Sequence, residues 1–425
     1  MSMLNYLQRY TGWIILATLI LFILGNLNPT LILVVAATAW LVVVIEWNRL
    51  HTGPRRQAAF LLVAGIVALI FSYQQGVFLG WKKIVTQNLQ LLPMFIAVSF
   101  LGLTNPDTLN DDLPKGRWAM AATSFGTNLL GAVINLSILF VFGDRLARNG
   151  SLTKAQSILL ARSFCAAAWW SPFFLAAGVA LTYAPDMLYN RTVIPGLFLC
   201  FVAICYSIIE VGFVRKLEFS GYPVRMESLT VPFLLAVGVF IGHYLFPDLG
   251  MIMLICLVAP PAAIILMRER PRLPYLYDFI NNRITSTVSQ FALFLTAGCF
   301  SIGITSIIQV YPDIFNFTGK AFTNSLFAVI SALLIGLGLI GLHPLVGISI
   351  VSPLLLPLHP DHSQLAFLFL TCWAVSTGSS PLSGVGLVLC SRYRISARSI
   401  LADNFHYAIA MWFCANLVNM FYFSE

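Results

Sequence analysis

Charged residues are scarce in this sequence. Asp, Glu, Lys and Arg make up 9% of its 425 residues, whereas a soluble domain carries about 25%. Hydrophobic residues make up 59%, and no stretch of low complexity interrupts them. The longest polar stretches, 213–228 and 268–285, have the length of loops. This shortage of charge argues against a soluble domain and predicts an all-α polytopic membrane protein.

The sequence also lacks the motifs that mark enzymes and metal sites. Its eight cysteines form no CxxC pair, so we expect buried thiols and neither disulfides nor a metal site. It contains no HExxH, no GxSxG and no paired carboxylates at helical spacing. The local cluster of His359, Asp361 and His362 is interpreted as a solvated loop. We therefore expect a protein that is not an enzyme and holds no cofactor, with Na⁺ considered only as a coupling ion.

Long apolar segments are abundant, and a helix needs roughly 20 apolar residues to cross a membrane. The first, 12–26, is predicted to be a retained span, because no small-residue cleavage site follows it. The eleven predicted spans are 12–26, 31–47, 58–80, 89–104, 156–184, 193–212, 229–247, 250–267, 286–309, 364–391 and 404–423.

Two further apolar segments, 117–142 and 322–358, do not fit a single crossing. The second has 37 residues and a His343-Pro344 step near its middle. A re-entrant hairpin, whose arms enter and leave on the same side, explains both its length and its polar centre. We predict two such hairpins, with tips at Ser124, Thr127 and Asn128 in the first and at His343 in the second.

The positions of the basic residues support this topology. If both segments are hairpins and the N-terminus is cytoplasmic, 20 of the 24 Lys and Arg residues lie on the cytoplasmic side. The net charge of +8 is therefore interpreted as a topology signal and not as a nucleic-acid surface. The predicted protein lies in a bacterial inner membrane, with its C-terminus outside. The four basic residues expected outside are Lys82, Lys83, Arg191 and Lys320.

The two halves of the chain resemble each other. The stretch "TNLLGAVI" (127–134) aligns with "HPLVGISI" (343–350), and Ser171-Pro172 aligns with Ser380-Pro381. An odd offset of five crossings makes the repeats inverted, as in many secondary transporters. The predicted parts are scaffold helices 1–88, a first repeat 89–212 with hairpin 117–142 and broken helix 156–184, scaffold helices and linker 213–285, and a second repeat 286–425 with hairpin 322–358 and broken helix 364–391.

The stretch "STGSSPLSG" (376–384) places small polar residues inside an apolar span. Pro381 lacks an N–H, so the helix cannot continue through it, and the freed N–H and C=O groups suit an anion and a cation. The alternative is a kinked helix whose hydroxyls bond back to their own carbonyls. The predicted substrate- and ion-binding residues are Ser376, Thr377, Gly378, Ser379, Ser380, Pro381 and Ser383, with His343, Thr127, Asn128, Ser171 and Trp170.

These features resemble the ion transporter superfamily, which includes the divalent anion/sodium symporters and the large membrane subunits of TRAP transporters. The resemblance is carried by "HPLVGISIVSPLLLPL" followed by "STGSSPLSGVGLVL", and covers roughly 89–212 and 286–423. It implies an elevator mechanism, a homodimeric scaffold, carboxylate-bearing substrates and Na⁺ coupling. The symporters carry Ser-Asn-Thr at both hairpin tips, where this chain has Thr127-Asn128 and His343-Pro344. His343 makes H⁺ a second candidate for the coupling ion.

Three functions are compatible with this pattern. The first is a secondary active transporter for a small organic or inorganic anion, coupled to Na⁺ or H⁺. The second is a TRAP-type large membrane subunit that needs a soluble binding protein. The third is a membrane-embedded enzyme or lipid-handling protein. The expected partners of the first are the anion, the coupling cation, membrane lipids and a second copy of the chain.

Overall fold

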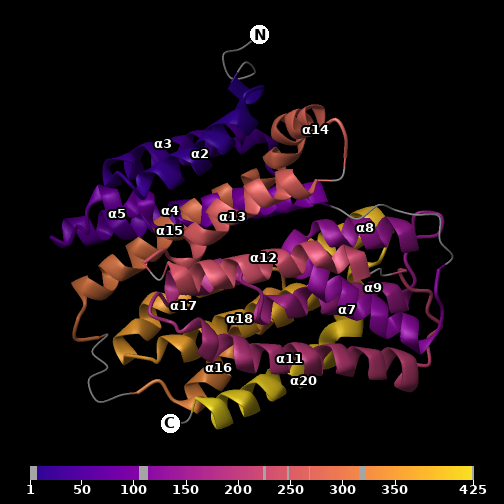
Figure 1. Cartoon of the computed structure of the whole chain (residues 1–425). Helices are drawn as coiled ribbons and strands as arrows, with labels where there is room; N and C mark the ends of the chain where they lie inside the picture. The colour runs from indigo at the N-terminus through magenta and orange to yellow at the C-terminus, as the bar shows by residue number, and fades with distance from the viewer. Residues whose placement is uncertain are drawn as a thin grey trace. The chain divides into compact units, whose positions relative to one another are not determined.

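The computed structural model describes residues 7–104, 113–223, 226–246, 248–267, 269–314 and 321–423. These residues are helical apart from turns, loops and two isolated β-bridges (Figure 1). The chain forms two compact units. Unit 1 comprises Met1–Thr104, Val237–Lys320 and Ser349–His359, and unit 2 comprises Asn105–Ala236, Ala321–Ile348 and Pro360–Glu425.

Unit 1 is built around α4 and α15, which pack along each other in parallel. Phe71 stacks on Tyr311 near the ends of this pair. The side-chain amide of Asn88 donates to the carbonyl of Phe294 at 3.1 Å and ties the chain before α6 to α15. The helices of unit 1 are α2 (Thr11–Gly25), α3 (Ile32–Glu46), α4 (Thr52–Gln74), α5 (Trp81–Thr86), α6 (Leu91–Ser99), α13 (Met251–Leu266), α14 (Arg272–Asp278) and α15 (Val288–Val310).

Unit 2 has a core made by two helices, α9 and α18. Every residue of α9 after Lys154 is buried, as is nearly all of α18. The helices of unit 2 are α7 (Arg117–Ile134), α8 (Ser137–Leu146), α9 (Lys154–Ala166), α10 (Leu175–Tyr183), α11 (Tyr189–Ile209), α16 (Asn324–Leu339), α18 (His362–Ser379), α19 (Gly384–Tyr393) and α20 (Ala397–Tyr422).

Two helices contribute residues to both units, and short 3₁₀ or π turns extend several others. The helices shared by both units are α12 (Met226–Leu245) and α17 (Pro344–Leu355). Within unit 2, α11 lies beside α20 (Figure 1). The short turns are η1 (Pro29–Leu31), η2 (Trp47–Arg49), η3 (Phe100–Thr104), η4 (Ala167–Trp169), η5 (Glu210–Val214), η6 (Phe279–Arg283), η7 (Ile284–Thr287) and η8 (Leu356–Leu358).

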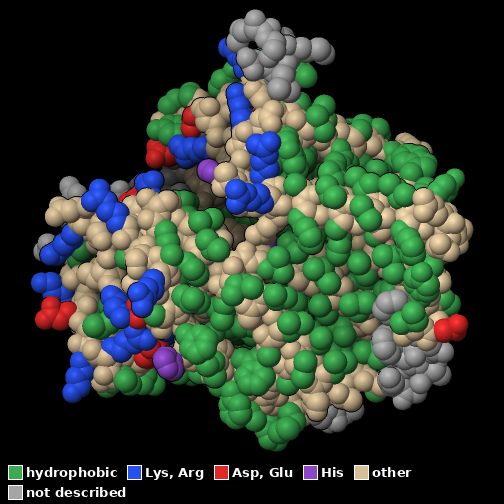
Figure 2. All heavy atoms as spheres, turned by 180° about the vertical axis from the view of Figure 1, so that it is seen from behind, with side chains coloured by type: hydrophobic (Ala, Val, Ile, Leu, Met, Phe, Trp, Pro, Cys, Tyr) green, Lys and Arg blue, Asp and Glu red, His purple; other side chains and the backbone are tan. Residues whose placement is uncertain are grey.

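Each of the eleven predicted spans falls on a helix or on a pair of consecutive helices. By length and composition, six helical stretches of the described chain could cross a membrane. Hydrophobic side chains cover much of the face drawn in Figure 2. These features fit a polytopic membrane protein, while the number of crossings stays a prediction. The six stretches are Pro29–Arg49, Thr52–Gln74, Trp81–Thr104, Tyr189–Val214, Arg272–Val310 and His362–Tyr393.

The first predicted hairpin has its turn at a different place from the one expected. Helix α7 continues to Ile134, and the chain turns at Asn135, which has a left-handed φ of 54°. The expected tip at Thr127 and Asn128 is therefore wrong, because both residues lie inside α7. No residue between Asn128 and Ile134 breaks the helix, and asparagine is one of the residues that most often accept the positive φ found where the helix ends.

The second predicted hairpin turns where the sequence indicated. Helix α16 ends at Leu339 and α17 begins at Pro344, so His343 lies in the turn between them. The alignment of 127–134 with 343–350 is consequently wrong in register. It pairs the end of a helix before the first turn with the start of a helix after the second turn.

The predicted repeats do not coincide with the compact units. In both halves the span before the hairpin, 89–104 in the first and 286–309 in the second, belongs to unit 1. The broken helices, with α7, α8 and α16, belong to unit 2. The two halves of the chain are thus divided between the units in a similar way, except that α17 is shared by both units whereas α8 lies wholly in unit 2.

Candidate functional site

The second helix break lies between α18 and α19. Ser380 leaves the helix with φ −92° and ψ 130°, and Pro381 follows it. Ser383 then caps α19 by accepting a hydrogen bond from the backbone N–H of Gly386 at 3.0 Å. The hydroxyl of Ser383 also lies 2.7 Å from the carbonyl of Thr377 and 2.8 Å from that of Ser380. The break is therefore an ordered turn with its own hydrogen bonds.

The first helix break lies between α9 and α10. The hydroxyl of Ser171 donates to the carbonyl of Ala132 at 2.5 Å and accepts from the N–H of Phe173 at 3.2 Å. The side chain of Asn135 donates to the carbonyl of Phe173 at 3.1 Å. These bonds attach the first break to the end of α7 and to the turn that follows it.

The second break is attached to its own hairpin helix in the same way. The hydroxyl of Ser380 lies 3.4 Å from the carbonyl of Leu339 and accepts from the N–H of Leu382 at 3.3 Å. Leu339 ends α16 as Ile134 ends α7. In each half, the serine before the proline bonds to the last turn of the first hairpin helix, which is α7 for Ser171 and α16 for Ser380. The two serines therefore hold equivalent positions.

The two broken helices pack antiparallel to each other. A Cβ on Gly378 would lie 3.1 Å from Cβ of Cys165, so the absence of a side chain lets α18 approach α9 closely. Further along the pair, Nε1 of Trp169 donates to Oγ1 of Thr371 at 3.1 Å. The first break thus lies beside Thr371, about nine residues or roughly 13 Å along α18 from Ser380.

Four buried hydroxyls in this region have no hydrogen-bond partner among the described residues. Oγ1 of Thr377 and Oγ of Ser379 belong to the end of α18, Oγ of Ser163 to α9, and Oγ of Ser124 to α7. Leaving a buried hydroxyl without a partner costs free energy, so each such group in a folded protein needs an explanation. A bound polar ligand would supply the missing partner.

Other contacts bring together the helices that carry these hydroxyls. Gly378, which lies between Thr377 and Ser379, faces Ala161 and Cys165 of α9, whereas Ser163 lies on the opposite side of that helix. The side chain of Asn128 donates to the carbonyl of Ser163 at 2.9 Å and joins α7 to the same level. Ser124 precedes Asn128 by one helical turn. Within unit 2, α9 therefore contacts α7 through the side chain of Asn128 and packs against α18 at Gly378.

Several predicted site residues are engaged within the protein. Ser376 bonds back to the carbonyl of Cys372 at 2.6 Å, and Thr127 bonds back to that of Thr123 at 2.7 Å. For these two residues the kinked-helix interpretation holds. Nε1 of Trp170 donates to Oδ1 of Asn128 at 3.2 Å, so both side chains hold the first break against α7.

His343 lies beside the second broken helix. Its ring makes an edge contact with the ring of Trp373, with centroids 5.2 Å apart. Nδ1 accepts from the N–H of Leu345 at 3.3 Å. If Nδ1 accepts this bond, Nε2 is the ring nitrogen left to bind a proton or a ligand.

Sequence analysis did not identify the ion-pair cluster inside unit 2. The side chain of Arg162 is 1% exposed and contacts Glu210 at 2.6 Å. It also donates to Oδ1 of Asn404 at 2.7 Å and to the carbonyl of Asp403 at 2.8 Å. Arg215 pairs with the side-chain carboxylates of Glu210 and Asp403. The signal that could have revealed the cluster is the presence of Arg162 and Glu210 inside two separate apolar segments, 156–184 and 193–212.

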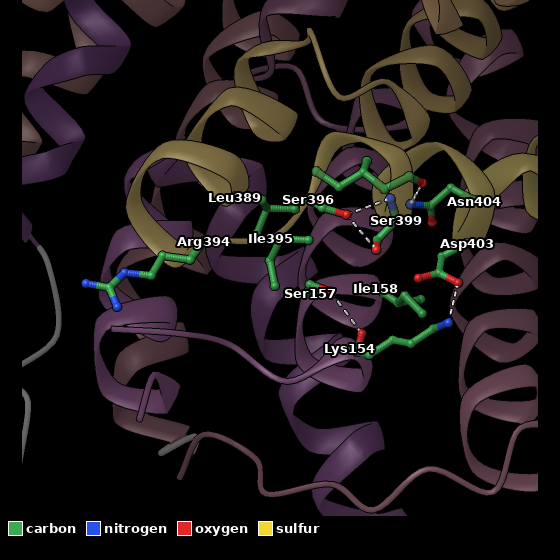
Figure 3. A pocket seen from close by; sticks show the side chains of 11 residues that line it. Lys154, Ser157, Ile158, Leu389, Arg394, Ile395, Ser396, Ser399, Asp403 and Asn404 are labelled. Atoms are coloured by element: carbon green, nitrogen blue, oxygen red, sulfur yellow. Dashed lines mark hydrogen bonds and ion pairs between the residues drawn. The ribbon is translucent and has the colours of Figure 1, made fainter. Parts of the chain in front are cut away.

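A pocket of about 240 Å³ borders this cluster. Figure 3 shows Lys154 reaching Asp403, an ion pair of 2.6 Å, and Arg394 pointing away from the other residues. Oγ of Ser396 lies 2.8 Å from Oγ of Ser399. Apart from Arg394, the polar side chains of the pocket bond within the protein, so the pocket is a junction of α9 and α20.

No protein-family profile and no curated protein matches this sequence. The fold is similar to that of the YdaH transporter of Alcanivorax borkumensis, whose crystal structure is described as having an unusual topology. The TM-score is 0.51 at 11% sequence identity, and the match covers 86% of this chain and 98% of the other. The similarity at this identity concerns the fold.

Proposed function

We propose that this chain is a secondary active transporter that moves a small organic or inorganic anion, in the first instance a carboxylate, across a bacterial inner membrane. The observation that carries the proposal is a pair of buried hydroxyls, Thr377 and Ser379, which adjoin the second Ser-Pro break and have no partner among the described residues. The fold is that of a protein described as a transporter, which agrees with the proposal.

The chemistry of the site suits an anion and a coupling cation. The hydroxyls of Thr377 and Ser379 can donate to a carboxylate oxygen, and hydrogen bonds to a charged group are stronger than those to a neutral group. The same oxygens, with the carbonyl groups at the end of α18, can coordinate Na⁺. H⁺ is the alternative coupling ion, and His343 would carry it.

Movement of unit 2 against unit 1 would give alternating access in the manner of an elevator. Unit 2 contains both helix breaks and the hydroxyls of Thr377 and Ser379, so the proposed site would move with one compact unit. The equivalent bonds of Ser171 and Ser380 support an inverted repeat with two re-entrant hairpins. In this mechanism unit 1 forms the scaffold, through which two copies would associate.

Uptake by the purified full-length chain in liposomes tests the proposal. Labelled mono-, di- and tricarboxylates, sulfate and phosphate are offered under an inward Na⁺ gradient and, separately, a pH gradient. We expect accumulation of one class of anion that depends on one of the two gradients. A chain that accumulates none of them alone, but does so with a soluble binding protein, would be a TRAP-type subunit instead.

Substitutions test the site within the same assay. Ser379→Ala and Thr377→Ala remove hydroxyls without internal partners, so we expect uptake to fall by about tenfold while thermal stability is unchanged. Ser391→Ala is the matched control, because this exposed serine of α19 only bonds back to the carbonyl of Leu387. Equal uptake by all three variants and the parent chain would refute the site assignment.

A further inference from the structure

A second, larger pocket opens at one end of unit 2. It has a volume of about 930 Å³ and lies between the start of α7, the loop before α9 and the segment that follows α11. Its floor includes Met120 and Phe219, which belong to a buried apolar cluster with Ile158, Leu159 and Val211. The floor is therefore part of the packed interior of unit 2.

Backbone bonds hold the walls of this pocket together. The N–H of Gly116 donates to the carbonyl of Phe219 at 3.1 Å, and the N–H of Gly221 donates to that of Pro114 at 2.7 Å. The side-chain amide of Gln156 donates to the carbonyl of Ser220 at 2.9 Å. The segment after α11 is thus attached to the starts of both α7 and α9.

The pocket is lined by basic residues, and the described part of the chain supplies them with no ion-pair partner. Lys115, Arg117, Arg148 and Lys216 line it, and Glu218 is the one acidic residue among the lining residues. None of the four cations forms an ion pair with any residue in the described ranges. The neighbouring cations Lys154, Arg162 and Arg215, in contrast, each form an ion pair with Glu210, Asp403 or both.

Exposed apolar groups adjoin these cations. The guanidinium of Arg117 lies over the ring of Phe213, 4.0 Å from its centroid. The next residues along the chain, Trp118 and Val214, are 89% and 71% exposed. Lys and Arg side chains also gather at one edge of the face drawn in Figure 2. A site with cations beside exposed aromatic and aliphatic groups matches the two parts of a phospholipid.

We propose that this pocket binds the headgroup of an anionic phospholipid. The phosphate would lie among Lys115, Arg117, Arg148 and Lys216, and the acyl chains would run along Trp118, Phe213 and Val214. Inorganic phosphate has no apolar part that could cover these exposed side chains, whereas a phospholipid does. The assignment is independent of the transported substrate, because the pocket and the helix breaks share none of their residues.

Lipid binding by the full-length protein in detergent tests the proposal. Phosphatidylglycerol, phosphatidylcholine and inorganic phosphate are titrated separately, and binding is followed by native mass spectrometry and by the shift in melting temperature. Arg117→Gln/Lys216→Gln should bind phosphatidylglycerol roughly 30-fold more weakly, since each cation near a lipid surface contributes about a fivefold factor. The matched control, Arg56→Gln/Arg398→Gln, removes two exposed cations elsewhere and should bind like the parent chain.

The outcomes separate the sources of phosphate. A preference for phosphatidylglycerol that is lost in the pocket variant and kept in the control supports the site. Equal binding by both variants, or equal binding of phosphatidylcholine, overturns it, and so does a comparable response to inorganic phosphate. If Arg117→Gln/Lys216→Gln does not fold, Lys115→Gln/Arg148→Gln replaces it, since both of these side chains are exposed.

Discussion

The guanidinium of Arg162 contacts the carboxylate of Glu210 at 2.6 Å, at a side chain that is 1% exposed. The two residues belong to α9 and to the turn that ends α11, and Asn404 of α20 binds the same guanidinium at 2.7 Å. A charge inside apolar surroundings is tolerated only when it is paired and fully hydrogen-bonded. The Arg162 side chain therefore links α9, the first part of a broken helix, to the end of α11 and to α20.

Replacement of Arg162 should destabilise the protein strongly. Arg162→Met leaves Glu210 with only its pair to Arg215, and breaking a buried ion pair costs about 3–5 kcal/mol. The melting temperature in detergent measures the loss. Arg191→Met is the control, because Arg191 pairs with Asp361 at an exposed site worth about 0–1 kcal/mol. Similar losses in the two variants would contradict the structural role of the buried pair.

The serines before the two prolines should differ in their contribution to stability. Ser171→Ala removes a 2.5 Å bond to the carbonyl of Ala132 and should cost about 1–3 kcal/mol. Ser380→Ala removes a 3.4 Å contact with Leu339 and should cost less, because the hydrogen bond is long. Urea or thermal unfolding of the two variants gives the order, and a larger loss for Ser380→Ala would be evidence against it.

Gly143 should not tolerate a side chain. A Cβ there would lie 2.4 Å from Cζ of Tyr393, whose buried ring cannot move away freely. Gly143→Ala should therefore cost about 1–3 kcal/mol by overpacking. Gly336→Ala in α16 has nothing within 4 Å of the added Cβ and should be neutral or stabilising. The two melting temperatures, measured in the same detergent, compare the sites directly.

The ion pair between Asp144 and Arg392 should make stability depend on pH. Arg392 donates to both oxygens of Asp144, at 2.8 Å and 2.7 Å, and this bonding holds the pKa of Asp144 below its usual 3.8. Because the pKa of Asp144 is lower in the folded protein than in the unfolded chain, the ionised carboxylate stabilises the fold at pH values above 3.8. This contribution is lost as the pH falls through the pKa of the folded state.

The comparison with Asp144→Asn measures this dependence. The parent chain should melt at a higher temperature than the variant near neutral pH, and the difference should shrink as the pH falls below about 4. The modest size of the difference follows from the exposure of the pair, which is 52% for Arg392 and 46% for Asp144. A difference that grows on acidification would rule out the assigned sign.

The positions of the helices were predictable from the sequence. Apolar runs of 15 or more residues became helices because a buried backbone must satisfy its own hydrogen bonds. The two breaks were predictable for the same local reason, since Pro172 and Pro381 cannot donate a helical hydrogen bond. The turn at His343-Pro344 was also indicated, because a polar step divides that apolar run.

Tertiary contacts decided the rest. The turn at Asn135 depended on one residue adopting a positive φ and on its bond to Phe173, neither of which an apolar pattern reveals. The hydroxyls of Ser376 and Ser379 look alike in the sequence, yet the first bonds to its own helix and the second has no partner among the described residues. Arg162, Glu210 and Asn404 are distant in sequence and come into contact only in the folded protein. A buried charge is tolerated only where the tertiary structure supplies such partners.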